Sequence, residues 1–365
     1  MITKDEVVEV LGRYDKDEIT LGMIGSHSAL DIADGAKDEG FRTVVICQRG
    51  REKPYLSFRR LYDEYIMLPK FKDALGKEVQ DKLRRMNTIF IPHRSFVVYL
   101  GYDGVEKEFL VPIFGNRALF RAEERDMPRN QYYLLEKAGI KYPKVFERPE
   151  DIDRPVLVKV MEKRRKIERA FFIASSYEDY VKKAKERIEK GLIGEEDLKK
   201  AKIEELAIGT YFNFNFFYSP LDEELQLMGI DRRLQTNLYD FVNYPARRQL
   251  EIDIPLQNIE VGHMPATIRE SLLEKVFEAG ERFVDAVRRE YPPGIIGPFA
   301  LQSVINTDLE LVVYDVSLRM PGSPIIATTS PYSKHYFGEV VSMGRRVAME
   351  LRKAIKEERL EEVVT

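Results

Sequence analysis

Short apolar runs alternate with amphipathic stretches over roughly the first hundred residues of the chain. We predict strands at the apolar runs, with helical patterns after the first strand and at 58–64 and 79–86; the strands cover residues 18–24, 41–47, 65–68 and 88–91. Strand, helix, strand at this spacing is typical of a parallel sheet with crossover helices. The pattern therefore predicts an α/β fold that begins with a doubly wound N-terminal domain.

The rest of the chain has longer elements and more paired strands. A polar segment at 121–130 marks a boundary, and Asn130 can cap the helix that follows it. Further on, Thr267 and Glu270 have the spacing of a capping box. We predict helices at 130–139, 176–191, 267–289 and 342–356, and strands at 156–160, 204–209, 211–218, 299–305 and 309–317.

Composition narrows the class of protein. The chain has 365 residues, of which 44% are hydrophobic, enough for two or three domains. No apolar run approaches the roughly 18–20 residues of a membrane span. The net charge of −3 argues against a nucleic-acid-binding protein, because such proteins usually carry a clear excess of basic residues. Cys47 is the only cysteine, which excludes an intramolecular disulfide, and we expect a cytoplasmic protein that binds neither membrane nor nucleic acid.

Two polar turns follow strands of the predicted parallel sheet. Gly25-Ser26-His27-Ser28 lies between a strand and a helix, where exposed amides favour an anion. His93-Arg94-Ser95 follows the strand at 88–91, and parallel strands end at the same sheet edge, so we expect both turns to line one pocket. Taken alone, each segment is more typical of ordinary structure: Gly25–Ser28 of a tight turn in which Ser26 or Ser28 caps the helix, and His93–Ser95 of a polar loop.

Three positions beyond the predicted N-terminal domain could serve a nucleotide and its metal ion. Lys159 interrupts an otherwise buried strand, and a buried lysine needs an anionic partner unless its amine reaches the surface. Gln302 and Asp315 lie on two neighbouring strands. With an even connecting loop, Gln302 faces Val313 and Asp315 lies diagonally beside it, about 7–8 Å away, close enough to share Mg²⁺. With an odd loop the two side chains point to opposite faces.

Several strings then identify a resemblance that spans nearly the whole chain. The sequence resembles the archaeal PurP family of 5-formaminoimidazole-4-carboxamide ribonucleotide synthetases in Ile24–Ser28, Pro112–Arg117, Gly209-Thr210, Phe216–Leu221, Arg269–Leu273, Pro292–Phe299 and Ser342–Gly344. The resemblance implies an N-terminal α/β domain at 1–122 and an ATP-grasp domain at 123–365, with a small subdomain at about 145–210. It also implies a ligase that uses ATP to join formate to 5-aminoimidazole-4-carboxamide ribonucleotide through formyl phosphate, in purine synthesis. A homo-oligomer is expected.

The resemblance assigns roles position by position. His27, Ser95 and His263 match substrate-binding positions, and Gln302 and Asp315 match a Mg²⁺-binding pair that is usually Gln and Glu. The positions that match the ATP site are Lys159, Glu204, Glu205, Leu206, Ala207, Ile208 and Gln235.

The departures from the family pattern cluster near the ATP site. The family's glycine-rich phosphate loop is replaced at 161–169 by a stretch without glycine that carries the cations Lys163–Lys166. Gln235 replaces a Glu, His263 replaces an Asn, and residues 320–324 differ as well. These changes predict a diverged paralog. They leave three hypotheses: the synthetase itself, a non-catalytic nucleotide-binding relative, or an ATP-grasp ligase for another acid or amine.

Overall fold

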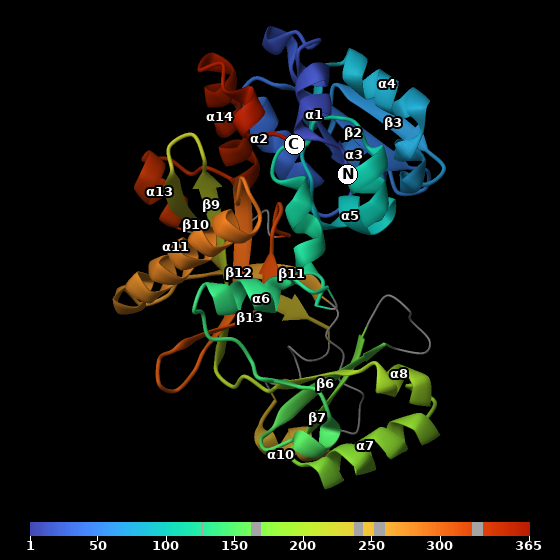
Figure 1. The fold of residues 1–365 in the computed structure, drawn as a ribbon, viewed down its shortest axis with the longest axis vertical. Helices are drawn as coiled ribbons and strands as arrows, with labels where there is room; N and C mark the ends of the chain where they lie inside the picture. The colour runs from blue at the N-terminus through green and yellow to red at the C-terminus, as the bar shows by residue number, and fades with distance from the viewer. Residues whose placement is uncertain (126, 162–168, 237–243, 252–259, 323–330) are drawn as a thin grey trace.

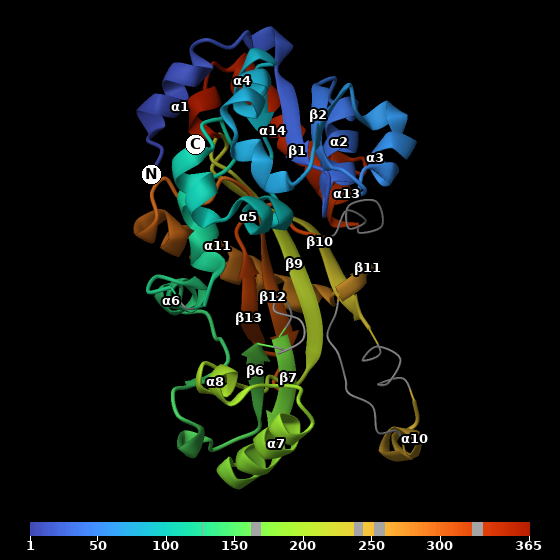
Figure 2. The same ribbon diagram turned by 90° about the vertical axis from the view of Figure 1, so that its right-hand side faces the viewer.

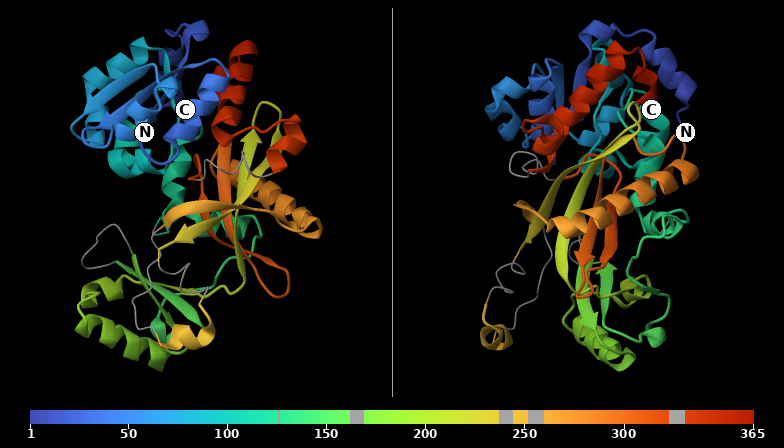
Figure 3. Two further views of the ribbon diagram at one scale, coloured as in Figure 1. Left: turned by 180° about the vertical axis from the view of Figure 1, so that it is seen from behind. Right: turned by 90° about the vertical axis from the view of Figure 1, so that its left-hand side faces the viewer.

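The computed structural model describes residues 1–125, 127–161, 169–236, 244–251, 260–322 and 331–365. Three sheets follow one another along the long axis of the molecule, with the five-stranded sheet in the middle (Figure 1). The side view shows the long strand β9 running from the parallel sheet toward the small sheet (Figure 2). From behind, the small sheet and its helices stand clear of the parallel domain (Figure 3).

The N-terminal sheet is parallel in the order β3-β2-β1-β4, as the sequence predicted. Alternate residues of its strands enter two separate cores: Val45 and Cys47 pack with one set of helices, and Val44 and Ile46 with the other. This is a doubly wound arrangement. Its elements are α1 (Lys4–Leu11), β1 (Thr20–Ile24), α2 (Ala29–Asp38), β2 (Arg42–Gln48), α3 (Lys53–Ser57), β3 (Glu64–Leu68), α4 (Lys77–Arg85), β4 (Thr88–Phe90) and α5 (Arg94–Leu100).

The last helix, α14 (Met343–Lys356), returns to this N-terminal domain and packs against α2. The two backbones approach so closely that a Cβ placed on Gly35 would lie 1.9 Å from the backbone nitrogen of Arg345. The Asp31 carboxylate accepts a 2.9 Å hydrogen bond from the backbone N–H of Gly344 at the start of α14. The core that contains Val45 and Cys47 is therefore built from both ends of the chain.

The central sheet is antiparallel in the order β11-β10-β9-β12-β13. Its strands are β9 (Thr210–Ser219), β10 (Glu224–Gln235), β11 (Glu260–Ala266), β12 (Gly297–Ile305) and β13 (Leu311–Ser317). Two helices, α6 (Gln131–Lys137) and α11 (Leu273–Glu290), share a core with one face of this sheet. A short helix, α13 (Tyr332–Phe337), packs near β10.

The small sheet has the order β5-β8-β6-β7 and its own core. It comprises β5 (Val145–Phe146), β6 (Val156–Met161), β7 (Arg169–Ala174) and β8 (Lys202–Glu205), with α7 (Tyr177–Glu189) and α8 (Glu195–Lys199). A separate turn of helix, α10, spans Ala246–Glu251. Ser176 caps α7 by accepting from the N–H of Asp179, which confirms the predicted helix start.

Three element predictions were wrong. The predicted helix at 58–64 is only a short 3₁₀ turn at Arg59–Leu61, because Pro54 starts α3 earlier in the chain. The helix predicted from residue 267 begins at Leu273, since β11 keeps the chain extended to Ala266 and the N–H of Ile268 is bound by the Tyr332 hydroxyl. The strand predicted at 204–209 lies at 202–205.

Among the helices of the described residues, none is both long enough and apolar enough to cross a membrane.

Candidate active site

One face of the central sheet is polar because of a strict alternation in β9. Asn213 and Asn215 alternate there with Phe212, Phe214 and Phe216. The phenylalanines pack in the core shared with α11, so the two asparagines lie on the opposite face of the sheet. Both asparagines are buried.

Polar side chains form a row across four strands of this face. Asn213 pairs directly with Asp231 of β10 on one side and with Gln302 of β12 on the other. Gln302 pairs in turn with Asp315 of β13. Because directly paired residues point to the same face of a sheet, the four side chains share one surface.

The register of Gln302 differs from the prediction. With an even connecting loop Gln302 was expected opposite Val313, but it lies directly opposite Asp315, while Val313 pairs with Ser303. Five residues, 306–310, join the paired strands, and this odd number alone would place Gln302 opposite Tyr314, with Asp315 on the other face. A β-bulge between Gln302 and Ser303 shifts the register by one more residue and brings Asp315 opposite Gln302. Gln302 and Asp315 still share a face, because direct neighbours do so as well as diagonal ones.

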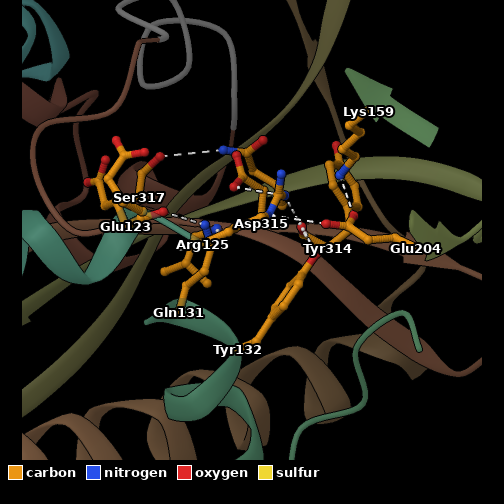
Figure 4. Close-up of polar contacts among 12 residues, drawn as sticks. Glu123, Arg125, Gln131, Tyr132, Lys159, Glu204, Tyr314, Asp315 and Ser317 are labelled. Carbon is orange, nitrogen blue, oxygen red and sulfur yellow. Dashed lines mark hydrogen bonds and ion pairs between the residues drawn. The ribbon is translucent and has the colours of Figure 1, made fainter. Parts of the chain in front are cut away.

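At one end of the row lies a group of charged residues that we call the ion-pair cluster: Arg125, Lys159, Glu204 and Asp315, of which Lys159 and Glu204 are buried (Figure 4). Arg125 lies between two carboxylates, with its Nη2 3.3 Å from Oδ1 of Asp315 and its Nε 3.6 Å from Oε1 of Glu204. Lys159 forms an ion pair with the other oxygen of Glu204. Arg125 thus links the central sheet to the small sheet.

The charges of this cluster shift each other's protonation. Burial would raise the pKa of Asp315, but the guanidiniums of Arg125 and Arg233 and the Lys159 amine outweigh burial, so the pKa is lowered. Burial lowers the pKa of Lys159, and Arg125 adds to that effect. Asp315 is therefore ionised at neutral pH, and its charge is already balanced by Arg125.

The other end of the row meets the turns after β1 and β4, and we call its residues the histidine cluster: His27, His93, Asp231 and His263. The rings of His27 and His93 stack with centroids 5.5 Å apart and an angle of 7° between planes. His27 has a φ of 51°, in the left-handed region that few non-glycine residues adopt. Such backbone conformations are concentrated at functional sites.

Desolvation lowers the pKa of His27, and the charges of His93 and Arg319 lower it further. The His27 side chain nevertheless remains accessible to solvent. His93 is fully buried, and burial lowers its pKa to about 4. Both rings are therefore neutral at pH 7.

His263, in contrast, is protonated at pH 7. Its Nδ1 lies 2.6 Å from Oδ2 of Asp231, and its Nε2 lies 2.8 Å from Oε1 of Glu260. Burial would lower the pKa of His263, but the hydrogen bonds to the two carboxylates outweigh it and raise the pKa to about 9. Asp231 is fully buried and also accepts hydrogen bonds from Asn213 and Asn215.

The three predicted substrate residues lie near one another. The Ser95 hydroxyl donates a 2.9 Å hydrogen bond to the Ser26 hydroxyl, which joins the turns after β1 and β4. His263 is near enough to His27 for its charge to lower the pKa of His27. The expectation that His27 and His93 share one region is confirmed.

The predicted ATP residues are more dispersed. Lys159 and Glu204 face each other, whereas Glu205 turns away and accepts from the backbone N–H of Lys144. Gln235 lies opposite Glu260 at the end of β10, and its position is nearer the histidine cluster. Leu206, Ala207 and Ile208 follow β8, with Ile208 largely exposed. Of the loop at 161–169, residues 162–168 lie outside the described residues.

Sequence reasoning missed Arg125, Asn213, Asn215, Asp231 and Arg233. The alternation of Phe and Asn in β9 was a usable signal, since it marks a strand with one apolar and one polar face. Arg125 carried no such signal, because it lies in a polar segment that reads as a linker.

The residues present fit a magnesium ion carried by phosphate. The Oε1 atom of Gln302 is buried without a hydrogen-bond partner among the described residues, and it faces the same side as the Asp315 carboxylate. An amide oxygen and a carboxylate are oxygen ligands of the kind that Mg²⁺ prefers. Within the described part of the chain, no three His, Cys, Asp or Glu residues gather into a metal site. Substrate phosphates would have to complete the coordination.

This architecture is similar to that of solved ligases. An ADP complex of PurK, an N5-carboxyaminoimidazole ribonucleotide synthetase, aligns with a TM-score of 0.60 at 14% identity, covering 87% of this chain and 76% of that chain. Phosphoribosylglycinamide synthetase from Anaerococcus prevotii aligns with a TM-score of 0.53. A parallel α/β domain followed by two antiparallel sheets of this kind defines the ATP-grasp class.

Sequence comparisons then specify the family. Two protein families match the chain. The family described as "Protein of unknown function (DUF1246)" matches residues 21–146, and the family described as "Domain of unknown function (DUF1297)" matches residues 179–365. The chain is 44% identical to the 5-formaminoimidazole-4-carboxamide-1-(beta)-D-ribofuranosyl 5'-monophosphate synthetase of Methanocaldococcus jannaschii and 45% identical to that of Methanopyrus kandleri, covering 100% of each chain. A crystal structure of PurP from Thermococcus kodakaraensis, an IMP biosynthesis protein, aligns with a TM-score of 0.73 at 32% identity, covering 94% of this chain and 100% of that chain. The chain belongs to this synthetase family.

Proposed function

We propose that this protein is an ATP-dependent ligase that joins formate to the 5-amino group of 5-aminoimidazole-4-carboxamide ribonucleotide, a step of purine biosynthesis. The observation that carries the proposal is the 44% and 45% identity, over the complete chain, with two synthetases named for the formylated product. The ATP-grasp fold supports it, because this fold suits an ATP-driven ligase.

The histidine cluster is the proposed site of the ribonucleotide. His27 and Ser95 lie at the joined turns after β1 and β4, where they would contact the substrate. Both ring nitrogens of His263 are already bound to carboxylates, so His263 would contribute positive charge rather than a hydrogen bond. Arg233 and Arg319, which pair with Glu260 and Glu123, lie beside this cluster, and their guanidinium groups suit the phosphate of a nucleotide.

The ion-pair cluster is the proposed site of ATP. Lys159 would exchange Glu204 for a phosphate, and Glu204–Ile208 would lie along the nucleotide, with Gln235 near it. Gln302 and Asp315 would hold Mg²⁺. When bound, Mg²⁺ neutralises the negative charge that develops on a transferring phosphoryl group.

The amine of an aminoimidazole is weakly nucleophilic, so formate must first be activated. Phosphorylation of formate gives formyl phosphate, a mixed anhydride whose phosphate is a good leaving group. The row from Asp315 to Asp231 spans the central sheet between the two clusters, so an acid activated at one end would meet the amine at the other.

The test is a reaction with formate, ATP and the ribonucleotide, followed by detection of the formylated product and of ADP. The synthetase forms product only when all three substrates are present. Tight binding of the ribonucleotide without turnover would indicate instead the non-catalytic paralog, and turnover with another acid would indicate a different ligase. The altered loop that motivates the diverged-paralog hypothesis lies largely at 162–168, outside the described residues, so the reaction itself must decide.

We also propose that the protein acts as a homo-oligomer in the cytoplasm, as the family resemblance implies. Its one cysteine, Cys47, is buried and unpaired, which suits a reducing compartment. Light scattering of the purified full chain measures the assembly directly.

A further inference from the structure

The hydrogen bonds around His27 determine which of its ring nitrogens carries the proton. Nδ1 of His27 lies 2.7 Å from the Ser28 hydroxyl oxygen, and that hydroxyl lies 2.5 Å from the carbonyl oxygen of Pro321. A carbonyl oxygen only accepts, so the single hydroxyl proton of Ser28 is donated to Pro321. The Ser28 oxygen must then accept from His27, which places the ring proton on Nδ1.

The other nitrogen of the neutral ring, Nε2, is therefore a bare acceptor. It makes no hydrogen bond with any described residue, and the His27 side chain is accessible to a ligand. Gly322 lies directly in front of it: a Cβ at position 322 would come within 2.9 Å of Nε2. A side chain at position 322 would crowd this nitrogen, whereas glycine leaves it uncovered.

His93 holds the ring of His27 from the other side. Its Nε2 donates a 2.9 Å hydrogen bond to the carbonyl oxygen of Ile24, because that oxygen also only accepts. His93 is fully buried and stacked on His27, so it restricts rotation of the His27 ring. The two neutral histidines thus have opposite, fixed tautomers.

We propose that Ser28 is a positioning residue that fixes the Nδ1–H tautomer of His27, and that the bare Nε2 of His27 accepts the proton that the substrate amine loses during formylation. The proposal rests on the proposed function, because it needs an amine nucleophile at this site. It assigns Ser28 a role in the chemistry without a direct contact to the substrate.

The proton and electron count of the step is balanced. The amine lone pair forms a C–N bond at the formyl carbon, and the C–O bond to phosphate breaks with its electron pair leaving on the phosphate oxygen. The nitrogen then loses one proton to His27 Nε2, and the resulting imidazolium keeps its Nδ1–H on Ser28. Nitrogen in the adduct is much more acidic than in the free amine, so a weakly basic ring suffices. The imidazolium returns its proton to the departing phosphate.

The tautomer can be observed directly by NMR of the full-length protein labelled with ¹⁵N only at histidine. The chain has four histidines, so the long-range ¹H–¹⁵N spectrum is sparse. We expect the wild type to show His27 with a protonated Nδ1 and an unprotonated Nε2. A wild-type His27 protonated at Nε2 overturns the proposal, whatever the activity.

Two variants at position 28 test whether the Ser28 hydroxyl itself, rather than the local backbone, fixes the tautomer of His27. In Ser28→Ala the Nδ1–H tautomer should no longer predominate, and kcat should fall about tenfold or more, while KM for ATP stays unchanged. Ser28→Thr keeps the hydroxyl and should retain both the tautomer and kcat. Ser57→Ala, which removes an exposed hydroxyl bonded only to the Lys53 carbonyl, is the matched control.

The outcomes separate this proposal from the proposed function. If wild-type protein forms no formylated product, the proposed function fails, and the step assigned to His27 fails with it. If the wild type is active and Ser28→Ala loses the tautomer without losing kcat, only the present proposal fails. Signals of His263 and His335 report whether Ser28→Ala is folded; if it is not, the wild-type spectrum and Ser28→Thr still decide.

Discussion

The two ends of the polar row are built in different ways. In the histidine cluster nearly every hydrogen-bonding atom has one assigned partner, and the exceptions are lone pairs: Nε2 of His27 and Nδ1 of His93. In the ion-pair cluster the charges satisfy each other, since Arg125 neutralises Asp315 and Lys159 neutralises Glu204. The first end is arranged for a ligand in advance, whereas the second must exchange ion pairs before a ligand can bind.

This difference has an energetic reason. A buried charge without a partner is costly, so a site that binds a highly charged nucleotide must keep its own charges paired when the ligand is absent. In the histidine cluster, His27 and His93 avoid that cost because their rings are neutral, and the protonated His263 avoids it because it is paired with Asp231 and Glu260. We therefore expect substitutions of charge in the ion-pair cluster to act mainly on ligand binding, and substitutions in the histidine cluster to act on stability and chemistry.

The largest effect is expected for Asp315→Ala. This change removes the only carboxylate of the proposed metal pair and leaves Arg125 without its partner at 3.3 Å. We expect Mg²⁺-dependent ATP binding to be lost in calorimetry and kcat to fall about 1,000-fold. The Asp222→Ala variant is the control, because Asp222 pairs with Lys353 at the surface, away from either cluster. Retention of Mg²⁺-dependent ATP binding in Asp315→Ala would remove Asp315 from the metal site.

Asp231→Asn should have the next largest effect, which we expect on the free energy of unfolding. Asp231 is fully buried and accepts from Asn213, Asn215 and His263, so an amide in its place turns an NH₂ group toward donors. We expect the free energy of unfolding in urea to fall by about 3 kcal/mol. A loss below about 1 kcal/mol, as expected for Asp222→Asn at the surface, would contradict a prearranged histidine cluster.

The charge on His263 makes stability depend on pH. Its pKa is raised to about 9 in the folded protein, against an ordinary value of about 6.5 in the unfolded chain. The protonated ring therefore stabilises the fold fully below pH 6.5, and this contribution is lost as the pH rises toward 9. We expect wild type to lose about 3 kcal/mol more than His263→Gln over that interval, since each pKa unit corresponds to about 1.4 kcal/mol. Urea unfolding at several pH values measures it, and parallel curves for the two proteins would disprove the effect.

Much of this comparison could not be read from the sequence, although much of the fold could. The parallel strands, the Asn130 and Ser176 caps and the strands β9 and β12 were predicted correctly, because periodicity and capping are local properties. The start of α11 was not, since a contact between Ile268 and the Tyr332 hydroxyl, far along the chain, sets it.

The candidate site likewise has some features that the sequence predicted and others that only the folded chain reveals. His27 and His93 were brought together correctly by the rule that parallel strands end at one edge of a sheet. The direct pairing of Gln302 with Asp315 depends on a bulge that alternation does not encode. Arg125 could not be found, because its partners Glu204 and Asp315 lie on two different sheets, and only the folded chain brings them together.

The smallest effect is expected for Gln302→Ala, and it tests whether charge governs the nucleotide end. Gln302 offers the metal a neutral amide oxygen, while Asp315 offers a full negative charge, although the two are direct partners in the sheet. Removing the amide deletes one ligand and should weaken Mg²⁺-dependent ATP binding less than tenfold, about 1 kcal/mol. Calorimetry of ATP with and without Mg²⁺ measures this, and the thermal midpoint checks that loss of a buried side chain has not unfolded the protein. If Gln302→Ala abolished metal-dependent binding as completely as Asp315→Ala, geometry rather than charge would control the site, and the buried Oε1 of Gln302 would be as essential as the carboxylate beside it.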